Sequence, residues 1–260
     1  MNALRKFHLW GLACYVLVCL WLPVACDPEP AEQKRNYSES RKPCRDYHSS
    51  KKAYFGDLHV HTSHSFDAWA YQTRVTPAQA YEFMKGKAVF LPPLDKDGKG
   101  TRKILLPRPL DFGAVTDHSE FLGEVALCTT KGSPAYDLEL CKSYRKQNAD
   151  SVVAFAAILS LEKPVRMSEV CGKGSKHCLD LAQQRWQSIQ VAAEDAYDRS
   201  ENCSFVSFVG YEYTATPNVS NMHRNVIFRN AQVVQRPLSA FDDITLTGVE
   251  SRVSRQARSV

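Results

Sequence analysis

Short apolar segments typical of strands alternate along the chain with longer segments of helical periodicity. Strands are expected at residues 54–60, 112–116, 205–213 and 223–228. Helices are expected at 78–85, 119–127, 135–147, 150–161 and 178–200. Strands separated by helices are the pattern of a mainly parallel sheet. The sequence therefore predicts an α/β sheet or barrel.

Local signals support two of these elements. Thr76 is a good N-cap, and Pro77 suits the first helical turn, so a helix is expected to begin there and to stop near Gly86. Residues 91–109 are rich in proline and contain an Asp-Gly pair, which predicts a loop or a hairpin between the first two strands.

The first 26 residues have the pattern of a secretory signal peptide. Arg5 and Lys6 precede an uncharged apolar run over residues 9–24. The small residue before Cys26 resembles a lipoprotein cleavage box, which would leave Cys26 as a lipid anchor. Simple cleavage to a soluble protein and an uncleaved membrane anchor remain alternatives. We expect an exported protein, periplasmic or lipid-anchored in the cell envelope.

Cysteines past the signal segment number six, and export favours their pairing in disulfides. They are Cys44, Cys128, Cys141, Cys171, Cys178 and Cys203. None belongs to a C-x-x-C pair, so a zinc-thiolate site is not expected. Many pairings are possible, and short loops favour two of them, Cys128–Cys141 and Cys171–Cys178.

Composition and charge indicate where the domain begins and ends and argue against one class of partner, nucleic acid. Residues 27–52 are charged and contain Ser and Pro, which indicates a linker; the domain is expected over 53–236 and an irregular tail over 237–260. The net charge of +5 comes largely from the two ends of the chain. No stripe of basic residues interleaves with aromatic residues, so we expect no nucleic-acid partner.

Histidines and carboxylates lie where the predicted strands end. His59 and His61 are two apart on the first strand, so their side chains point to one face and can chelate a cation. His118 follows the second strand, and Glu212 ends the third. Carboxyl ends of parallel strands meet in one crevice. His223 opens the fourth strand and reaches this crevice only if the 213–222 loop folds back.

These motifs together resemble the polymerase and histidinol phosphatase (PHP) superfamily. They are Asp-Leu-His-Val-His-Thr at 57–62 with Asp67 behind it, Thr-Asp-His at 116–118 and Gly-Tyr-Glu at 210–212. Segments 208–215 and 221–230 resemble more closely a bacterial subgroup of exported PHP-like proteins of unknown function. The resemblance covers residues 53–236.

The resemblance implies a distorted (β/α) barrel with two or three divalent metal ions, Zn or Mn. It implies that His59 and His61 hold the first metal and that Glu212 bridges two metals. Asp67 and His118 would help to hold a third, with Asp67 standing where relatives often have histidine. His223 is a further expected metal ligand, and Glu212 and His118 are the expected catalytic residues.

Neighbouring polar residues have two interpretations each. Asp57 and Asp117 either orient the imidazoles or cap turns. His64 is either a ligand or, as we expect, a solvated loop residue. Arg74 and Arg224 either clamp a phosphate or lie at the surface in salt bridges.

The function expected from this pattern is a metal-dependent hydrolase, a phosphoesterase that uses metal-bound hydroxide on a small-molecule phosphoester. However, relatives supply more ligands from later strands, and no histidine follows His223 here. The chain thus looks like a truncated, incomplete PHP-type barrel, which we expect to be unstable or to associate with another chain that completes it. The alternative is a non-catalytic metal-binding or envelope interaction protein.

Overall fold

The structure, a computed structural model, describes residues 43–242. The predicted signal peptide 1–26, with the proposed anchor at Cys26, lies outside the described residues, as do 27–42 of the predicted linker and 243–260 of the predicted tail. Among the described residues, no helix is both long enough and apolar enough to cross a membrane.

Four strands form the main sheet of the described part. Their order is β1 (Gly56–Val60), β4 (Phe112–Val115), β5 (Val206–Ala215) and β6 (Met222–Ile227). The first three run parallel, as predicted, whereas β6 runs antiparallel to β5 because it returns through a short turn that holds a 3-10 helix, η2 (Pro217–Val219). The predicted α/β class is confirmed.

The sheet is curled into a half-barrel. In a flat sheet, β1 and β6 would lie three strand spacings apart, about 14 Å. Yet Asn225 Nδ2 on β6 donates a hydrogen bond of 2.9 Å to the Leu58 carbonyl on β1. The two outer strands therefore approach each other across the concave face, which is how side chains from distant strands can meet there.

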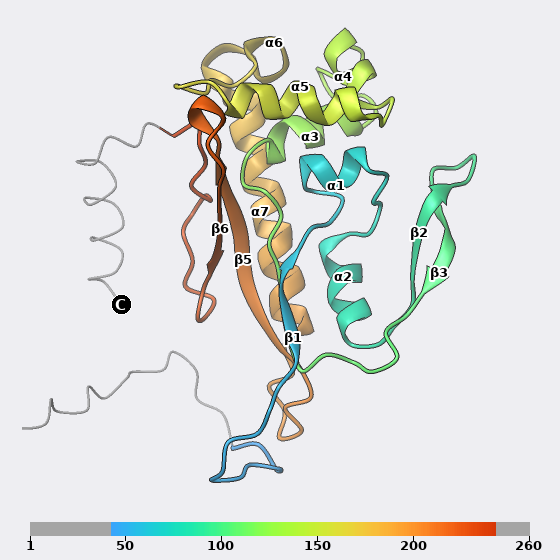
Figure 1. Cartoon of the computed structure of the whole chain (residues 1–260), viewed down its shortest axis with the longest axis vertical. Helices are drawn as coiled ribbons and strands as arrows, with labels where there is room; N and C mark the ends of the chain where they lie inside the picture. The colour runs from blue at the N-terminus through green and yellow to red at the C-terminus, as the bar shows by residue number, and fades with distance from the viewer. Residues whose placement is uncertain (1–42, 243–260) are drawn as a thin grey trace, which may run out of the picture. The chain divides into compact units, whose positions relative to one another are not determined.

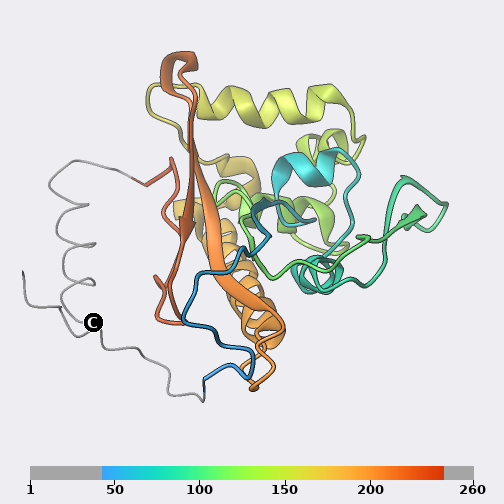
Figure 2. The ribbon, with the colours of Figure 1, turned by 60° about the horizontal axis from the view of Figure 1, so that its bottom comes forward.

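Two helices, α2 (Pro77–Met84) and α7 (Lys176–Ala196), cover the convex face (Figures 1 and 2). The α2 N-terminus is the predicted one, with a capping box between Thr76 and Gln79. Gly113 on β4 permits the close approach of α2, since a Cβ there would lie 2.2 Å from Met84 Sδ. The buried core of this layer includes Trp186, Ile189, Val209 and Tyr211.

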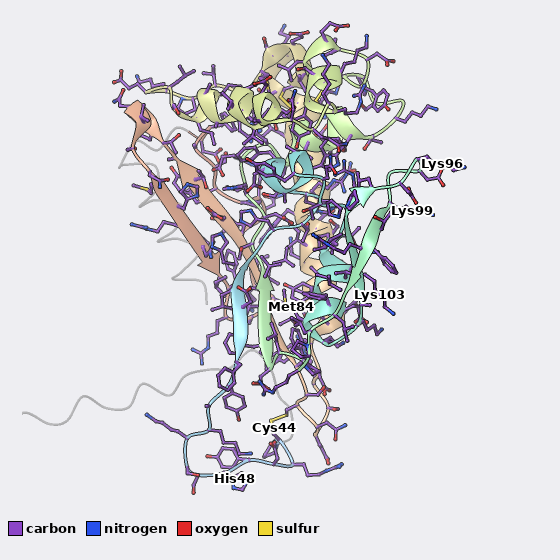
Figure 3. All side chains as sticks on the ribbon, turned by 45° about the vertical axis from the view of Figure 1, so that its right-hand side comes forward. Cys44, His48, Met84, Lys96, Lys99 and Lys103 are labelled. Carbon is purple, nitrogen blue, oxygen red and sulfur yellow. A yellow bond between two sulfur atoms is a disulfide. The ribbon has the colours of Figure 1, made fainter. Side chains whose placement is uncertain are left out.

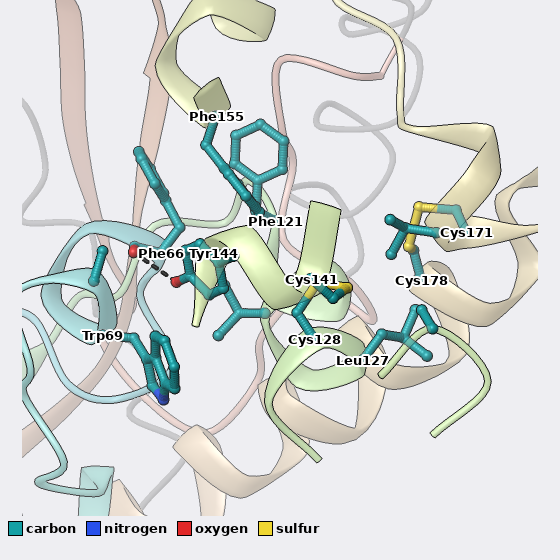
Figure 4. Close-up of a cluster of buried hydrophobic side chains, with 14 of the residues drawn as sticks. Phe66, Trp69, Phe121, Leu127, Cys128, Cys141, Tyr144, Phe155, Cys171 and Cys178 are labelled. Atoms are coloured by element: carbon teal, nitrogen blue, oxygen red, sulfur yellow. Dashed lines mark hydrogen bonds between the residues drawn. A yellow bond between two sulfur atoms is a disulfide. The ribbon is translucent and has the colours of Figure 1, made fainter. Parts of the chain in front are cut away.

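Smaller helices gather beyond the carboxyl ends of the parallel strands (Figure 1). They are α1 (Phe66–Ala70), α3 (Leu122–Thr129), α4 (Glu139–Tyr144), α5 (Ala149–Leu159), α6 (Ser168–Cys171) and the 3-10 helix η1 (Lys173–Ser175). Helices α3, α4, α5 and α7 occur where helices were predicted, and each is shorter than the predicted range. Their apolar faces form a second core, which includes Phe66, Phe121 and Phe155 (Figure 4).

The proline-rich segment after α2 is an antiparallel hairpin of β2 (Val89–Leu94) and β3 (Gly100–Ile104), which confirms one of the two forms expected for it. The hairpin projects away from the main sheet and carries Lys96, Lys99 and Lys103 along its length (Figure 3). These lysines are exposed, and like charges along an edge strand oppose its pairing with another sheet.

Three disulfides are present in the described part. Cys128–Cys141 and Cys171–Cys178 are the two pairs that short loops predicted. The third, Cys44–Cys203, spans 159 residues and ties the described end of the predicted linker to the loop before β5 (Figure 3). The three disulfides are compatible with an exported protein.

Residues 237–242 have no helix or strand, as expected for an irregular tail, but they are packed. The Leu238 carbonyl accepts a 2.7 Å hydrogen bond from Ser119 Oγ. The Ala240 amide donates to Glu120 at 3.0 Å, and the Phe241 ring packs edge-on against Phe121. These contacts cover buried polar groups beside β4.

Candidate metal site

Strand alternation places four side chains on the concave face of the sheet. His59 and His61 share one side of β1, and Glu212 and Thr214 share one side of β5. The β5–β6 register pairs Thr214 with His223, and directly opposed residues of an antiparallel pair point to the same face. The antiparallel return of β6 thus brings His223 to the crevice, which was the condition set by the sequence.

Backbone bonds beyond β4 hold His118 beside β5. His118 forms a parallel bridge with Glu212, whose carbonyl accepts from the Ser119 amide at 2.8 Å. The Ser65 hydroxyl lies 3.2 Å from the His118 amide. His118 is only 4% exposed, so this backbone framework sets its position.

Asp67 enters the site from the first turn of α1. The preceding residue, Phe66, is buried, and its ring lies 4.9 Å from the His118 ring. The Tyr144 hydroxyl donates to the Phe66 carbonyl at 2.7 Å, a bond drawn in Figure 4. The helical core therefore anchors Asp67 next to the histidines.

All six predicted ligands fall into three overlapping groups that could hold a metal ion. Within each group, the candidate ligand atoms lie within 4.8 Å of one another. The groups are His59, His61 and Glu212; His61, Asp67 and His118; and His118, Glu212 and His223. That these residues bind metal stays a prediction.

Glu212 is the shared carboxylate of two groups. Its Oε2 lies 2.9 Å from His59 Nε2 and 2.7 Å from His61 Nε2. Its Oε1 contacts His223 Nδ1 and lies 3.8 Å from His118 Nδ1. One carboxylate thus faces four imidazoles, two with each oxygen.

Asp67 completes the remaining group from the other side of His61. Its carboxylate lies 3.2 Å from His61 Nδ1 and 3.6 Å from His118 Nε2.

The Glu212 side chain is 1% exposed, whereas the His59 and His223 side chains are 58% and 43% exposed. The cluster is therefore closed at its carboxylate centre and open to solvent along the outer strands.

Charges in the cluster compensate one another. Burial lowers the pKa of His61, but hydrogen bonds to Asp67 and Glu212 outweigh it and raise this pKa to about 10. Burial alone would raise the pKa values of the Asp67 and Glu212 carboxyls. Hydrogen bonds from His118 and His61 to Asp67, and from His61 to Glu212, instead hold both pKa values well below their usual range. The ionised carboxylates thus need a positive charge among them, which a proton on His61 supplies and a bound cation could replace.

The two aspartates beside the ligands hold backbone rather than imidazoles. Asp57 Oδ1 accepts from the His59 amide at 2.9 Å. Asp117 is fully buried and accepts from the amide and the hydroxyl of Thr62. Asp57 therefore stabilises its own stretch of chain, whereas Asp117 ties the end of β4 to the segment that follows β1. Burial raises the pKa of Asp117 to about 6.

Three other residues of the sequence analysis lie elsewhere. His64 is buried rather than solvated: it is 4% exposed, and its Nε2 lies 2.6 Å from Arg185 Nη1. Burial and the Arg185 charge lower the pKa of His64 to about 3. Arg74 donates to backbone carbonyls and lies over the Trp69 ring, so it is not free to clamp a phosphate. Arg224 donates to the His223 carbonyl at 3.1 Å.

Two residues of the cluster were missed by the sequence analysis. Thr214 lies two residues after Glu212, and Glu120 lies two residues after His118, so same-face spacing was an available signal. Glu120 accepts hydrogen bonds from the Thr214 and Ala240 amides. Burial raises the pKa of Glu120 to about 8. A fourth group, Glu124 with Cys171 and Cys178, is no metal candidate because the disulfide uses both sulfurs.

Comparison with known families corrects the resemblance drawn from the motifs. The family that matches is described as "Protein of unknown function (DUF3604)", over residues 48–251, and nothing in this match indicates the PHP superfamily. No curated protein and no solved structure matches the chain. The match covers most of the sequence, including the whole candidate metal site. The chain therefore belongs to the DUF3604 family.

Proposed function

We propose that this protein is a metal-dependent hydrolase acting on small phosphoesters. The observation that carries the proposal is the sharing of Glu212, whose two oxygens face two different pairs of imidazoles. A carboxylate in this arrangement can bridge adjacent cations. Paired cations about 3.5–4 Å apart are a recurrent feature of enzymes that cleave phosphate esters.

The donor set suits Zn or Mn. Imidazole nitrogens and carboxylate oxygens are good ligands for both ions, and the cluster contains no thiolate that would favour softer metals. The low pKa of the Asp67 and Glu212 carboxyls keeps them ionised and ready to bind a cation at neutral pH. Bound cations lower the pKa of coordinated water and so supply a nucleophile near neutral pH.

The proposal assigns catalytic and metal-binding roles to different residues of the chain. Glu212 and His118, both buried and held by backbone bonds, are the residues on which we expect catalysis to depend. His59, His61, Asp67 and His223 complete the proposed metal-binding set. The exposed side chains of His59 and His223 mark the side from which a substrate can approach.

The alternative is a non-catalytic metal-binding or envelope interaction protein, and one observation favours it. Each candidate group has only three protein ligands. Among the described residues, none after His223 adds a ligand: Asp242 is held by Arg236 and by Ser239. A set this sparse can bind a cation without the further groups that turnover needs. Association with a second chain is a separate proposal, which holds for a hydrolase and for a non-catalytic protein alike.

Export, a cleaved signal peptide and a lipid anchor at Cys26 are also proposals. The disulfides support export, since such bonds persist in oxidising compartments. The segment that would carry the signal and the anchor lies outside residues 43–242.

The test measures metal binding and turnover separately. Metal content of the purified protein is determined, and hydrolysis of an aryl phosphate is followed with added Zn or Mn. A free ion at 100 times its Kd should stabilise the protein by about 2.7 kcal/mol, which raises Tm by about 5–11 °C for a domain of this size. Glu212→Gln should abolish both the stabilisation and the hydrolysis. Glu139→Gln should abolish neither, because the Glu139 side chain is exposed.

Each outcome favours one proposal. Binding with Glu212-dependent turnover supports the hydrolase. Binding without turnover favours the non-catalytic alternative. Turnover that His61→Ala leaves unchanged favours it too, because such activity would not come from this site. Absence of both binding and thermal stabilisation refutes the metal site.

A further inference from the structure

One face of the β2–β3 hairpin presents apolar and basic side chains to solvent together. The strand register places Phe90 directly opposite Lys103, and directly opposed residues of an antiparallel pair point to the same face. Leu105 lies two residues after Lys103 and continues this face. Phe90 is 52% exposed and Leu105 is 59% exposed. We call the surface formed by Phe90, Lys103 and Leu105 the outer face of the hairpin.

The opposite face of the hairpin is turned toward the body of the protein. Val89 is paired with Ile104 on this side and is only 8% exposed, and β2 contacts helix α2. The hairpin projects beyond α2 and away from the main sheet (Figures 1 and 3). The outer face can therefore meet a large partner without a collision between that partner and the main sheet.

Basic side chains of the hairpin have no acidic partners in the described part of the chain. Lys96 and Lys99 lie at the tip, and Lys103 lies farther along (Figure 3). None of these three exposed lysines forms an ion pair within residues 43–242. The Asp95 carboxylate accepts hydrogen bonds of 2.9 Å from two backbone amides of the turn. Five basic residues stand against two aspartates in segment 87–105, so the hairpin is positively charged.

We propose that the outer face and tip of the hairpin dock the protein on a membrane surface that contains anionic phospholipid. Lysines near such a surface are attracted to its negative charge. Apolar side chains beside them, here Phe90 and Leu105, gain by entering the boundary between headgroups and acyl chains. The long stem of Lys103 lets its ammonium group stay among the headgroups while its neighbours go deeper.

The exposed apolar residues distinguish a lipid surface from a soluble acidic polymer. Such a polymer would contact the lysines and leave Phe90 and Leu105 in water. Large apolar side chains that are more than half exposed side by side are typical of a surface that a partner covers. The inference does not depend on the proposed metal site, because no candidate ligand belongs to the hairpin.

The readout has to be local to the hairpin, because the apolar run 9–24 can bind vesicles by itself. Hydrogen exchange of the full chain, read by mass spectrometry, supplies this resolution. Exchange is compared for peptides from segment 87–105 and from helix α7. The vesicles are equal parts phosphatidylcholine and phosphatidylglycerol, or phosphatidylcholine alone. Exchange without vesicles shows whether a variant keeps the hairpin folded.

Three double variants separate the contribution of charge from that of the apolar side chains. The control removes two positive charges from exposed lysines outside the hairpin. The threonine substitutions keep β-branched residues, which suit a strand. The variants are Lys96→Gln/Lys99→Gln, Phe90→Thr/Leu105→Thr and, as the control, Lys131→Gln/Lys173→Gln.

We expect segment 87–105 to gain protection with the anionic vesicles and not with phosphatidylcholine alone, and to lose it at high salt. A lysine near an anionic surface strengthens binding about fivefold, so Lys96→Gln/Lys99→Gln should raise the lipid concentration for half-maximal protection about 25-fold. Phe90→Thr/Leu105→Thr should raise it as well, and the control should not.

Three results would each overturn the inference. They are no protection of the hairpin by anionic vesicles, equal protection by phosphatidylcholine alone, and a loss in the control as large as in Lys96→Gln/Lys99→Gln. Heparin, a soluble polyanion, provides the last comparison. If heparin protects the hairpin as well as the vesicles do, and Phe90→Thr/Leu105→Thr has no effect on either, the partner is an acidic polymer and the membrane proposal is refuted.

Discussion

Replacing Glu212 with glutamine tests how the charges of the cluster are balanced. The substitution keeps the side-chain shape but removes the negative charge that lies 2.7 Å from His61 Nε2. In the metal-free protein, His61 has a pKa raised to about 10 against burial, through its bonds to Asp67 and Glu212. Asp67 remains in the variant, so the pKa of His61 should fall without returning to its ordinary value.

The size of the effect follows from the contact distance. An ionised neighbour within hydrogen-bond reach shifts a pKa by about one to three pH units, equivalent to about 1.4–4 kcal/mol. Because the folded-state pKa is raised, its contribution to stability is full below pH 6.5 and is lost as pH rises through about 10. In Glu212→Gln, this loss should be complete at a lower pH than in the wild type.

The assay is an NMR titration of the His61 ring in chelator-treated protein, paired with urea unfolding across the same pH range. Glu139→Gln is the control, because the Glu139 side chain is 88% exposed and bonds only Lys142. The reasoning is refuted if His61 titrates near 6.5 in the wild type. It is equally refuted if Glu212→Gln shifts the His61 pKa no more than the control does.

Two further predictions concern stability. Removing the Cys44–Cys203 disulfide with paired alanine substitutions should lower the free energy of unfolding by about 5 kcal/mol, and removing Cys171–Cys178 should lower it by about 2.5 kcal/mol. The difference comes from chain entropy, because the two bonds span 159 and 7 residues. Urea unfolding that reversed this order would contradict the loop-length argument. Burial raises the pKa of Glu120 to about 8, so stability should be lost as pH rises from about 4.5 through 8. Glu120→Gln should flatten this pH dependence, and equal slopes would count against it.

Local patterns in the sequence predicted the order of strands and helices and two disulfides. Helix periodicity, the Thr76 cap and short cysteine loops all act between residues close in the chain. The pairing of Cys44 with Cys203 could not be chosen in this way, because it depends on which loops the fold brings together. The curl of the sheet, the antiparallel direction of β6 and the packing of residues 237–242 depend on tertiary contacts in the same sense.

Parts of the candidate site were likewise predictable from local spacing, and other parts were not. Same-face spacing placed His59 beside His61, and convergence of strand ends predicted that His118 and Glu212 would lie near them. Burial could not be inferred from these patterns: His64 was expected in solvent and lies in the interior. Motif similarity also went further than the family comparison allows, because the short motifs matched while the family found over residues 48–251 is DUF3604.

The sequence by itself determined the type and order of the elements and which polar side chains stand at strand ends, because periodicity and spacing are properties of neighbouring residues. Only the tertiary structure decided that Glu212 faces four imidazoles and that Thr214 lies against His118. These contacts join β1, β5, β6 and the end of β4, and they exist because the sheet curls and β6 folds back. Distances across a curled sheet depend on the packing of helices on its convex face, which no local pattern specifies.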